Sequence, residues 1–144
     1  MEKKKPAKLP DKPDRYFPGY VYQLYSLPEQ SVEETTDGTR RKRTGFEMCG
    51  PHKGLVVSSA EFNDTQSRGL IVIPLSSDDG KKPQPTWVRA RVKGEVAFIL
   101  CEQIRYIDRS RCGSLQGKLH EYDWNSVQKI LQNLLFTEWA ESKP

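Results

Sequence analysis

The chain has 144 residues, a length that suits a single domain built around one core. Its 23 Lys and Arg residues outnumber the 19 Asp and Glu residues, and the net charge of +4 is compatible with a polyanionic partner without requiring one. No apolar run approaches the ~20 residues that span a bilayer, and no apolar signal segment follows the basic first residues, so we expect a cytoplasmic protein with no membrane partner.

Residues 1–15 are rich in Lys, Pro and Asp and show no apolar periodicity. Such a composition buries too little surface to offset the entropy of ordering, so this segment is predicted to be a disordered basic tail. A single folded domain is predicted over 16–144. The tail either adds attraction for phosphate groups or only keeps the protein in solution, and the sequence leaves both open.

The first predicted strand spans 20–25, where aromatic and β-branched residues dominate. The polar stretch that follows, 26–44, contains Pro28 and Gly38 but few apolar residues. We predict that it is a long mobile loop. Its basic run at 40–43 either contacts phosphate groups or is a solvated surface.

Further strands are predicted from short apolar runs bounded by glycine and polar residues. The runs at 54–58 and 69–75 are typical of buried central strands, and two more strands are predicted at 95–101 and 104–107. Turn signals between strands favour antiparallel connections; they are Asp79-Gly80 and Lys93-Gly94.

The segment 86–92 alternates between two kinds of side chain. Trp87, Arg89 and Arg91 fall on one face of the predicted strand, and small or branched apolar residues fall on the other. This pattern predicts a strand with one buried face and one basic face.

A helix is predicted at the end of the chain, capped by Asp123 or Asn125. Apolar residues recur at helical spacing along it and predict a wide stripe against the sheet; they are Trp124, Val127, Ile130, Leu131, Leu134, Leu135 and Trp139. For His120, just before the helix, a structural role is favoured. Strands followed by one helix indicate a mainly β fold, either a barrel with helical additions or a compact α+β domain.

The three cysteines, Cys49, Cys101 and Cys112, give an odd count with no Cys-x-x-Cys or Cys/His spacing. A disulfide framework and a structural zinc site both need a different pattern. We therefore expect ordinary thiols in a reducing compartment and no metal site.

Several motifs, in the same order along the chain, resemble the MazF/PemK family of toxins. The segment GFEMCGPHKGLVVS at 45–58 resembles the family's G-x-E-Q-x-G-x-R-P-x-x-V-V-S, and Phe62-Asn63 matches the aromatic-Asn pair that follows it. The segment IPLSS at 73–77 resembles the strand ending in P-x-T-T/S. The most specific match is LCEQIRYIDRSR at 100–111, which is similar to D/E-Q-[IV]-[RK]-x-[IL]-D-x-x-R.

The resemblance covers roughly 18–137, beginning at a G-x-V/I-x strand at 19–22, and it implies a small SH3-like barrel of the kind shared with CcdB. It also implies a homodimer, a groove for single-stranded RNA and a cognate antitoxin that plugs this groove. The implied activity is metal-independent RNA cleavage with no cofactor, leaving a 2′,3′-cyclic phosphate and a 5′-hydroxyl end.

The chain departs from the family pattern at the positions that matter for catalysis. The family's catalytic Arg falls on His52, its catalytic Thr falls on Ser76, and the Pro after the Arg becomes Lys53. Attack by a ribose 2′-hydroxyl needs a base, an acid and positive charge or hydrogen-bond donors near the phosphate. An imidazole at 52 supplies a base or an acid, a Ser at 76 keeps the hydroxyl donor, and Glu47 either acts as the base or orients His52.

RNA binding is predicted for the residues around this site and for the basic strand face, because single-stranded nucleic acid is held by aromatic stacking and phosphate attraction. The predicted RNA contacts are Lys53, Ser77, Trp87, Arg89 and Arg91. Trp87 is equally compatible with a half-buried place in the core or in a dimer interface.

Two other function classes stay open at this point. The His at position 52 favours a catalytically inactive relative that binds RNA or its antitoxin without cutting. A gyrase poison of the CcdB kind shares the fold, but the segment 47–58 argues against it because that segment resembles the ribonuclease branch.

Overall fold

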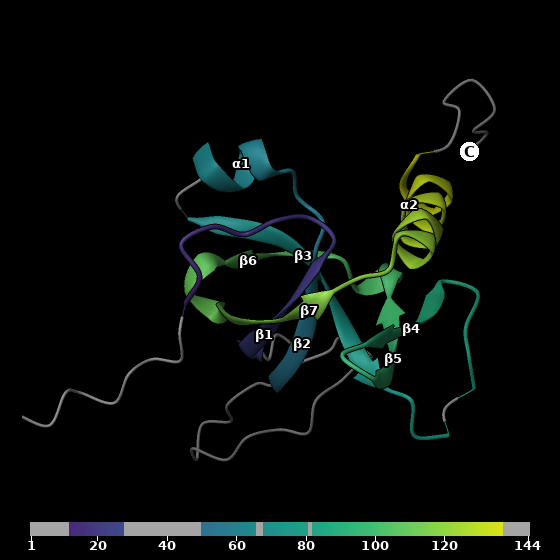
Figure 1. Cartoon of the computed structure of the whole chain (residues 1–144). Helices are drawn as coiled ribbons and strands as arrows, with labels where there is room; N and C mark the ends of the chain where they lie inside the picture. Colours follow the sequence, from purple (N-terminus) through teal and green to yellow (C-terminus); the bar gives the residue numbers. More distant parts are fainter. Residues whose placement is uncertain (1–11, 28–49, 66–67, 81, 137–144) are drawn as a thin grey trace, which may run out of the picture.

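The computed structural model describes residues 12–27, 50–65, 68–80 and 82–136. Figure 1 shows a curled sheet with the long helix beside one end of it and a short helix near the other. The elements in chain order are β1 (Tyr20–Leu27), β2 (Gly50–Val56), α1 (Ala60–Thr65), β3 (Gly69–Ser77), β4 (Trp87–Val92), β5 (Glu95–Leu100), the 3₁₀ turn η1 (Cys101–Gln103), β6 (Arg105–Asp108), the 3₁₀ turn η2 (Arg109–Arg111), β7 (Cys112–Lys118) and α2 (Glu121–Leu135).

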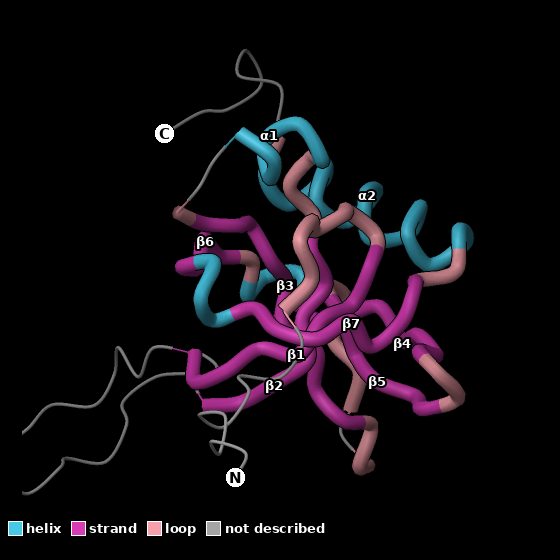
Figure 2. Tube along the Cα trace, turned by 60° about the vertical axis from the view of Figure 1, so that its left-hand side comes forward, coloured by secondary structure: helices cyan, strands magenta, loops and turns pink. Residues whose placement is uncertain are grey.

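The strands pair antiparallel in the order β4-β5-β3-β2-β1-β7, and β6 pairs with β3 beside this path. Strand β3 is central because its first half pairs with β6 and its second half pairs with β5. The turn η1 lies between β5 and β6 and carries the chain from one half of β3 to the other. The tube in Figure 2 shows the strands curling around a common centre, with α2 beside β4.

The two faces of the central strands pack into two apolar clusters, because side chains alternate along a strand. Leu55 and Ile73 lie in the first cluster, which α2 completes with the buried Val127. Val56 and Val72 lie in the second cluster, which contains Tyr16 from the segment before β1. The predicted fold, mainly β with a C-terminal helix, is confirmed.

Most predicted strands are confirmed, and the main correction concerns β2. We predict this strand from residue 54, but it begins at Gly50 and pairs His52 with Leu24 of β1. His52 therefore lies in a strand, because backbone pairing with β1 extends the strand beyond its apolar run. The helix α1 and the strand β7 are not predicted from the sequence, since both are short and largely polar.

The β4–β5 turn signal is confirmed as a two-residue hairpin. Val92 pairs with Glu95, and the two residues between them, Lys93 and Gly94, have φ values of 50° and 79°. Positive φ at both central positions is the type I′ geometry that matches the twist of the flanking strands. This hairpin fixes the register of β4 against β5.

The start of α2 differs from the prediction. His120 is the N-cap residue, and its Nδ1 accepts a hydrogen bond of 3.1 Å from the backbone N–H of Tyr122. Asp123 and Asn125 lie inside the helix, because the chain already turns at Glu121. The structural role predicted for His120 is confirmed.

The apolar stripe of α2 is narrower than predicted. Val127 is fully buried, and Trp124, Ile130 and Leu131 pack against the first cluster. Leu134 and Leu135 are 40% and 50% exposed, because they lie in the last turn of the helix. Trp139, also predicted in the stripe, lies outside the described residues.

Part of the predicted tail and most of the predicted loop lie outside the described residues, including Glu47 and the basic run at 40–43. Within the tail, residues 12–15 contact the domain: Arg15 forms an ion pair of 2.6 Å with Asp64, and Lys12 Nζ donates to the carbonyl of Ser110 at 3.2 Å. In the described ranges, the helices are too short and too polar to cross a membrane.

Candidate active site

Strand pairing brings His52 and Ser76 together on one face of the sheet. Lys53 of β2 pairs with Leu75 of β3, and the two strands are antiparallel. The residue before Lys53, His52, therefore lies beside the residue after Leu75, Ser76. Ser76 pairs with Phe98 of β5, and Phe98 pairs with Arg89 of β4. Directly opposed residues point to the same face, and neighbouring strands lie about 4.8 Å apart. We call His52, Ser76, Phe98 and Arg89 the site row.

Exposure increases toward both ends of the site row. Ser76 and Phe98 in the middle are 8% and 2% exposed, His52 is partly buried, and Arg89 is exposed. A hydroxyl at the centre is thus flanked by an imidazole on one side and a guanidinium farther along. These groups are the kinds that donate to a phosphate and transfer protons.

Trp87 and Arg91 extend this face along β4. Each lies two residues from Arg89, and the predicted alternation is confirmed, since Val88, Ala90 and Val92 are buried. The Trp87 ring contacts Phe98 with ring centroids 5.3 Å apart at 44°. Five of the predicted site residues therefore share one face: His52, Ser76, Trp87, Arg89 and Arg91.

Both arginines of β4 have partners nearby. Arg89 Nε donates to Asp78 at 2.8 Å, and Arg91 donates to the carbonyl of Gly94 at 3.3 Å. The Arg89 side chain is nevertheless 65% exposed. A surface ion pair of this kind contributes little to stability. It orients the Arg89 guanidinium, and exchanging Asp78 for an incoming phosphate costs little free energy.

Lys53 and Ser77 lie on the opposite face, because each is one residue away from a member of the site row. Lys53 Nζ forms an ion pair of 2.9 Å with Glu95, and this bond lowers the pKa of Glu95. With Ser76 and Ala97, these residues line a hollow of about 150 Å³. The side chains of Lys53 and His52 therefore point to opposite faces, although Lys53 shares this hollow with Ser76.

Glu102 fixes the position of Trp87. Its two carboxylate oxygens accept hydrogen bonds from the indole Nε1 of Trp87 and from the hydroxyl of Thr86, both at 2.8 Å. The turn η1 places Glu102 next to the end of β4, and the neighbouring Gln103 accepts a hydrogen bond of 2.8 Å from Arg105. The particular partner, Trp87, gives no signal in the sequence.

The buried thiols take no part in this site. Burial raises the pKa of Cys101 and that of Cys112 to about 12 each, so both are protonated at neutral pH and are poor nucleophiles. Both are free thiols, as predicted, and Cys49 lies outside the described residues. Across the described ranges, the His, Cys, Asp and Glu side chains form no group of three that could hold a metal ion.

Other residues of the recognised motifs hold the fold together. The side-chain amide of Asn63 donates to the carbonyls of Tyr16 and Ser58 at 2.9 and 3.0 Å and also bonds the hydroxyl of Ser58. Arg109 donates to the carbonyl of Asn63 at 2.7 Å. Asp108 accepts from the backbone and hydroxyl of Ser110 and so caps η2. These contacts tie the segment before β1 to α1 and η2.

Solved structures share this arrangement of a half-barrel sheet and a C-terminal helix. The chain is similar to MazF from Deinococcus radiodurans, with 21% identity over 87% of this chain and 100% of that chain and a TM-score of 0.67. It is also similar to MazF in a MazE-MazF crystal structure from the same organism (20% identity, 88% and 100% coverage, TM-score 0.62). An endoribonuclease from Mycobacterial species, solved with its cognate antitoxin, gives 16% identity, 88% and 99% coverage and a TM-score of 0.59.

These likenesses define the MazF fold, a small mainly β domain with a helix at its end. Residues 39–135 match the family model of PemK-like, MazF-like toxins of type II toxin-antitoxin systems. The match spans most of the chain, and the chain belongs to this family. No curated protein matches it in sequence.

Proposed function

We propose that this toxin is a sequence-specific endoribonuclease that cleaves single-stranded RNA without a metal ion, in the cytoplasm, and thereby inhibits translation and growth. The observation that carries the proposal is the site row, which sets His52 beside Ser76 and leads across Phe98 to Arg89. The family supports the reaction class, and the side chains of this row have the chemistry that the reaction needs.

In the proposed reaction the ribose 2′-oxygen attacks the adjacent phosphorus and the bond to the 5′-oxygen breaks. A 2′,3′-cyclic phosphate forms, and the 5′-oxygen takes up a proton. His52 transfers a proton in one of these steps, since an imidazole both accepts and donates protons near neutral pH. The Ser76 hydroxyl donates to a phosphate oxygen, and Glu47 is proposed to orient His52 or to act as the base.

Substrate binding is assigned to the face beside the site row. The Trp87 ring offers a surface for stacking a base, and Arg89 and Arg91 attract phosphates. Lys53 and Ser77 are assigned to RNA binding because they share a hollow with Ser76. No cofactor enters this scheme.

The proposed protein partners are a cognate antitoxin and a second copy of the chain. MazF of Deinococcus radiodurans and the Mycobacterial endoribonuclease were each solved with an antitoxin, and the present chain is similar to both over their full length. We propose that the antitoxin covers the site row and that the toxin is a homodimer.

The test is incubation of the pure protein with a long single-stranded RNA in EDTA, followed by mapping of the ends. We expect cuts at a recurrent short sequence, with 5′-hydroxyl and 2′,3′-cyclic phosphate ends. RNA that is bound but stays intact would overturn the ribonuclease proposal. It would support the second candidate, an inactive RNA- or antitoxin-binding relative, which the His in place of Arg at position 52 favours.

Glu102 gives a separate prediction about binding. Glu102→Ala removes both acceptors that hold Trp87 and Thr86, so the indole loses its fixed orientation. Base stacking is worth about 1–3 kcal/mol, and we expect RNA affinity to fall roughly fivefold with little change in the single-turnover rate at saturating protein. The measurement is the Kd for an oligonucleotide carrying a 2′-deoxy residue at the cut.

Two comparisons show whether Glu102 acts through Trp87. Trp87→Phe keeps an aromatic ring but removes the N–H, so the double variant should lose no more affinity than Glu102→Ala alone. Glu61→Ala, an exposed carboxylate on α1, should bind RNA like the wild type. Fully additive losses would contradict the assignment.

A further inference from the structure

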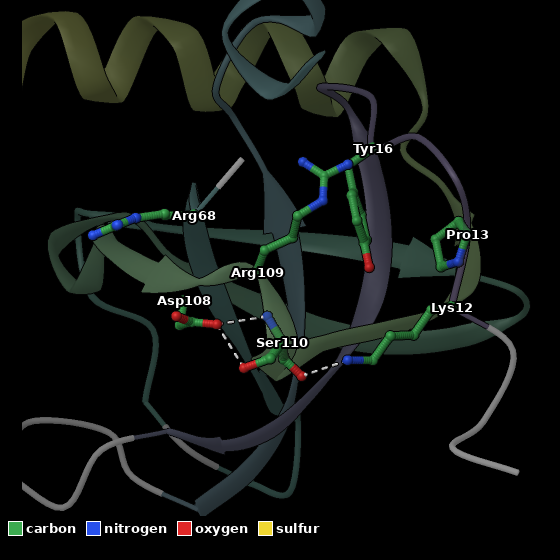
Figure 3. A pocket seen from close by; sticks show the side chains of 7 residues that line it. All are labelled: Lys12, Pro13, Tyr16, Arg68, Asp108, Arg109 and Ser110. Carbon is green, nitrogen blue, oxygen red and sulfur yellow. Dashed lines mark hydrogen bonds between the residues drawn. The ribbon is translucent and has the colours of Figure 1, made fainter. Parts of the chain in front are cut away.

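A basic hollow lies at the end of β3 that is opposite to the site row. Its volume is about 400 Å³, and its lining includes Lys12, Arg68, Asp108, Arg109 and Ser110. Figure 3 shows Arg68 and Lys12 on either side of the Asp108–Ser110 segment, with Arg109 directed along the Tyr16 ring. Three cationic side chains and one carboxylate therefore line this hollow.

Two cations of this hollow, Arg109 and Lys12, are held in place by different contacts. Arg109 lies over the Tyr16 ring at 4.7 Å and donates to the carbonyl of Asn63 at 2.7 Å. Lys12 Nζ donates to the carbonyl of Ser110 at 3.2 Å. The backbone carbonyl of Arg68 accepts a hydrogen bond of 2.7 Å from the backbone N–H of Arg109. Arg68 is exposed.

The carboxylate does not neutralise the hollow. Asp108 accepts 2.8 and 2.6 Å hydrogen bonds from the backbone and hydroxyl of Ser110, and these bonds lower its pKa. Arg111 and Lys12 lower the pKa further by their charge, which indicates a positive potential around Asp108. Both hydrogen bonds go to Oδ1, and the single carboxylate offsets only one of the three cations that line the hollow, so a net positive charge remains for an external anion.

We infer that this hollow binds a phosphate of the RNA strand outside the cleavage site, with Arg68 and Lys12 as its main contacts. The inference rests on the proposed function, because it assigns the hollow to the same substrate. Arg68 immediately precedes β3 and is eight positions from Ser76, roughly 26 Å along an extended strand at about 3.3 Å per residue, so the phosphate belongs to a nucleotide several positions from the cut.

The distance predicts that the contribution of this hollow to RNA affinity depends on RNA length. This dependence distinguishes the hollow from the site row in a binding experiment. A short oligonucleotide at the site row does not reach Arg68, whereas a long one does. Phosphate contacts are also salt-dependent, and each one on single-stranded RNA contributes about 0.7 to the slope of log K against log salt concentration.

The experiment compares Arg68→Glu with the wild type on two oligonucleotides, of about 5 and about 20 nucleotides, each with a 2′-deoxy residue at the cut. We expect Arg68→Glu to weaken binding of the long one roughly fivefold to tenfold at low salt and to lower its salt slope by about 1. Binding and cleavage of short RNA should not change. Lys12→Glu should act in the same direction, and Lys129→Glu, an exposed lysine of α2, is the control with the same charge change.

Each outcome separates the two proposals. Equal losses on short and long oligonucleotides, or equal losses in Lys129→Glu, would overturn the hollow as a site while leaving the ribonuclease proposal intact. An unchanged long-oligonucleotide affinity in both Arg68→Glu and Lys12→Glu would do the same. If the wild type neither binds nor cuts short RNA, the proposed function fails, and the inference about the hollow fails with it. Thermal unfolding of each variant shows whether it is folded.

Discussion

Replacing His52 by Ala should reduce the single-turnover rate of RNA cleavage by about 10²–10⁴-fold, the usual contribution of one general acid or base. His52 lies beside the buried Ser76 in the site row. Because this row contains no other imidazole, no neighbouring side chain replaces its proton transfer. The measurement is the cleavage rate of a short RNA at saturating protein, with the Kd determined separately on a 2′-deoxy oligonucleotide.

His52→Gln tests proton transfer against binding. The amide keeps hydrogen-bonding groups in a similar place but does not titrate, so we expect affinity near that of the wild type and a rate close to that of His52→Ala. His52→Arg restores the residue that the family pattern places here, and it should recover much of the rate. A His52→Gln variant that cuts at the wild-type rate would remove His52 from the catalytic role.

The sequence predicted the parts of the fold that rest on periodicity. The strand 86–92 alternates clearly, and its buried and exposed faces are as predicted. The Lys93-Gly94 turn sets the hairpin register through residues that tolerate positive φ. Helix α1 was missed because its buried residue is the polar Asn63, which carries no hydrophobic signal.

The residues of the candidate site could be predicted from the sequence, but which of their side chains lie on the same face of the sheet could not. Lys53 follows His52 in the sequence, and only the strand assignment of β2 shows that the two point to opposite faces. The bond from Trp87 to Glu102 joins residues fifteen positions apart through a 3₁₀ turn, which no local pattern indicates. Motif resemblance located the site, and strand register determines which of its members meet.

Asn63 should be the residue whose loss destabilises the protein most among the polar positions of the recognised motifs. It is 1% exposed, and its side chain satisfies the carbonyls of Tyr16 and Ser58 and bonds the Ser58 hydroxyl. Asn63→Ala leaves the two carbonyls without this donor, at about 1–3 kcal/mol for each. It also removes the acceptor of the Ser58 hydroxyl, which still accepts from the backbone N–H of Ile71. We expect a loss of roughly 3 kcal/mol in the free energy of unfolding, or about 10 °C in Tm for a domain of this size.

Two matched variants test this hydrogen-bond network, with stability measured by urea and thermal unfolding. Asn125→Ala, on the exposed side of α2, should change stability by no more than about 0.5 kcal/mol. Asn63→Asp keeps the volume but replaces the amide donors by an acceptor facing two carbonyls, so it should destabilise at least as much as Ala. If Asn63→Asp were as stable as the wild type, the donated hydrogen bonds would not be what ties the segment before β1 to α1. Arg109 donates to the backbone carbonyl of Asn63, which these substitutions keep. Loss of the side-chain bonds to Tyr16 and Ser58 should still loosen the segment that lines the basic hollow, so binding of long RNA should weaken more than binding of short RNA.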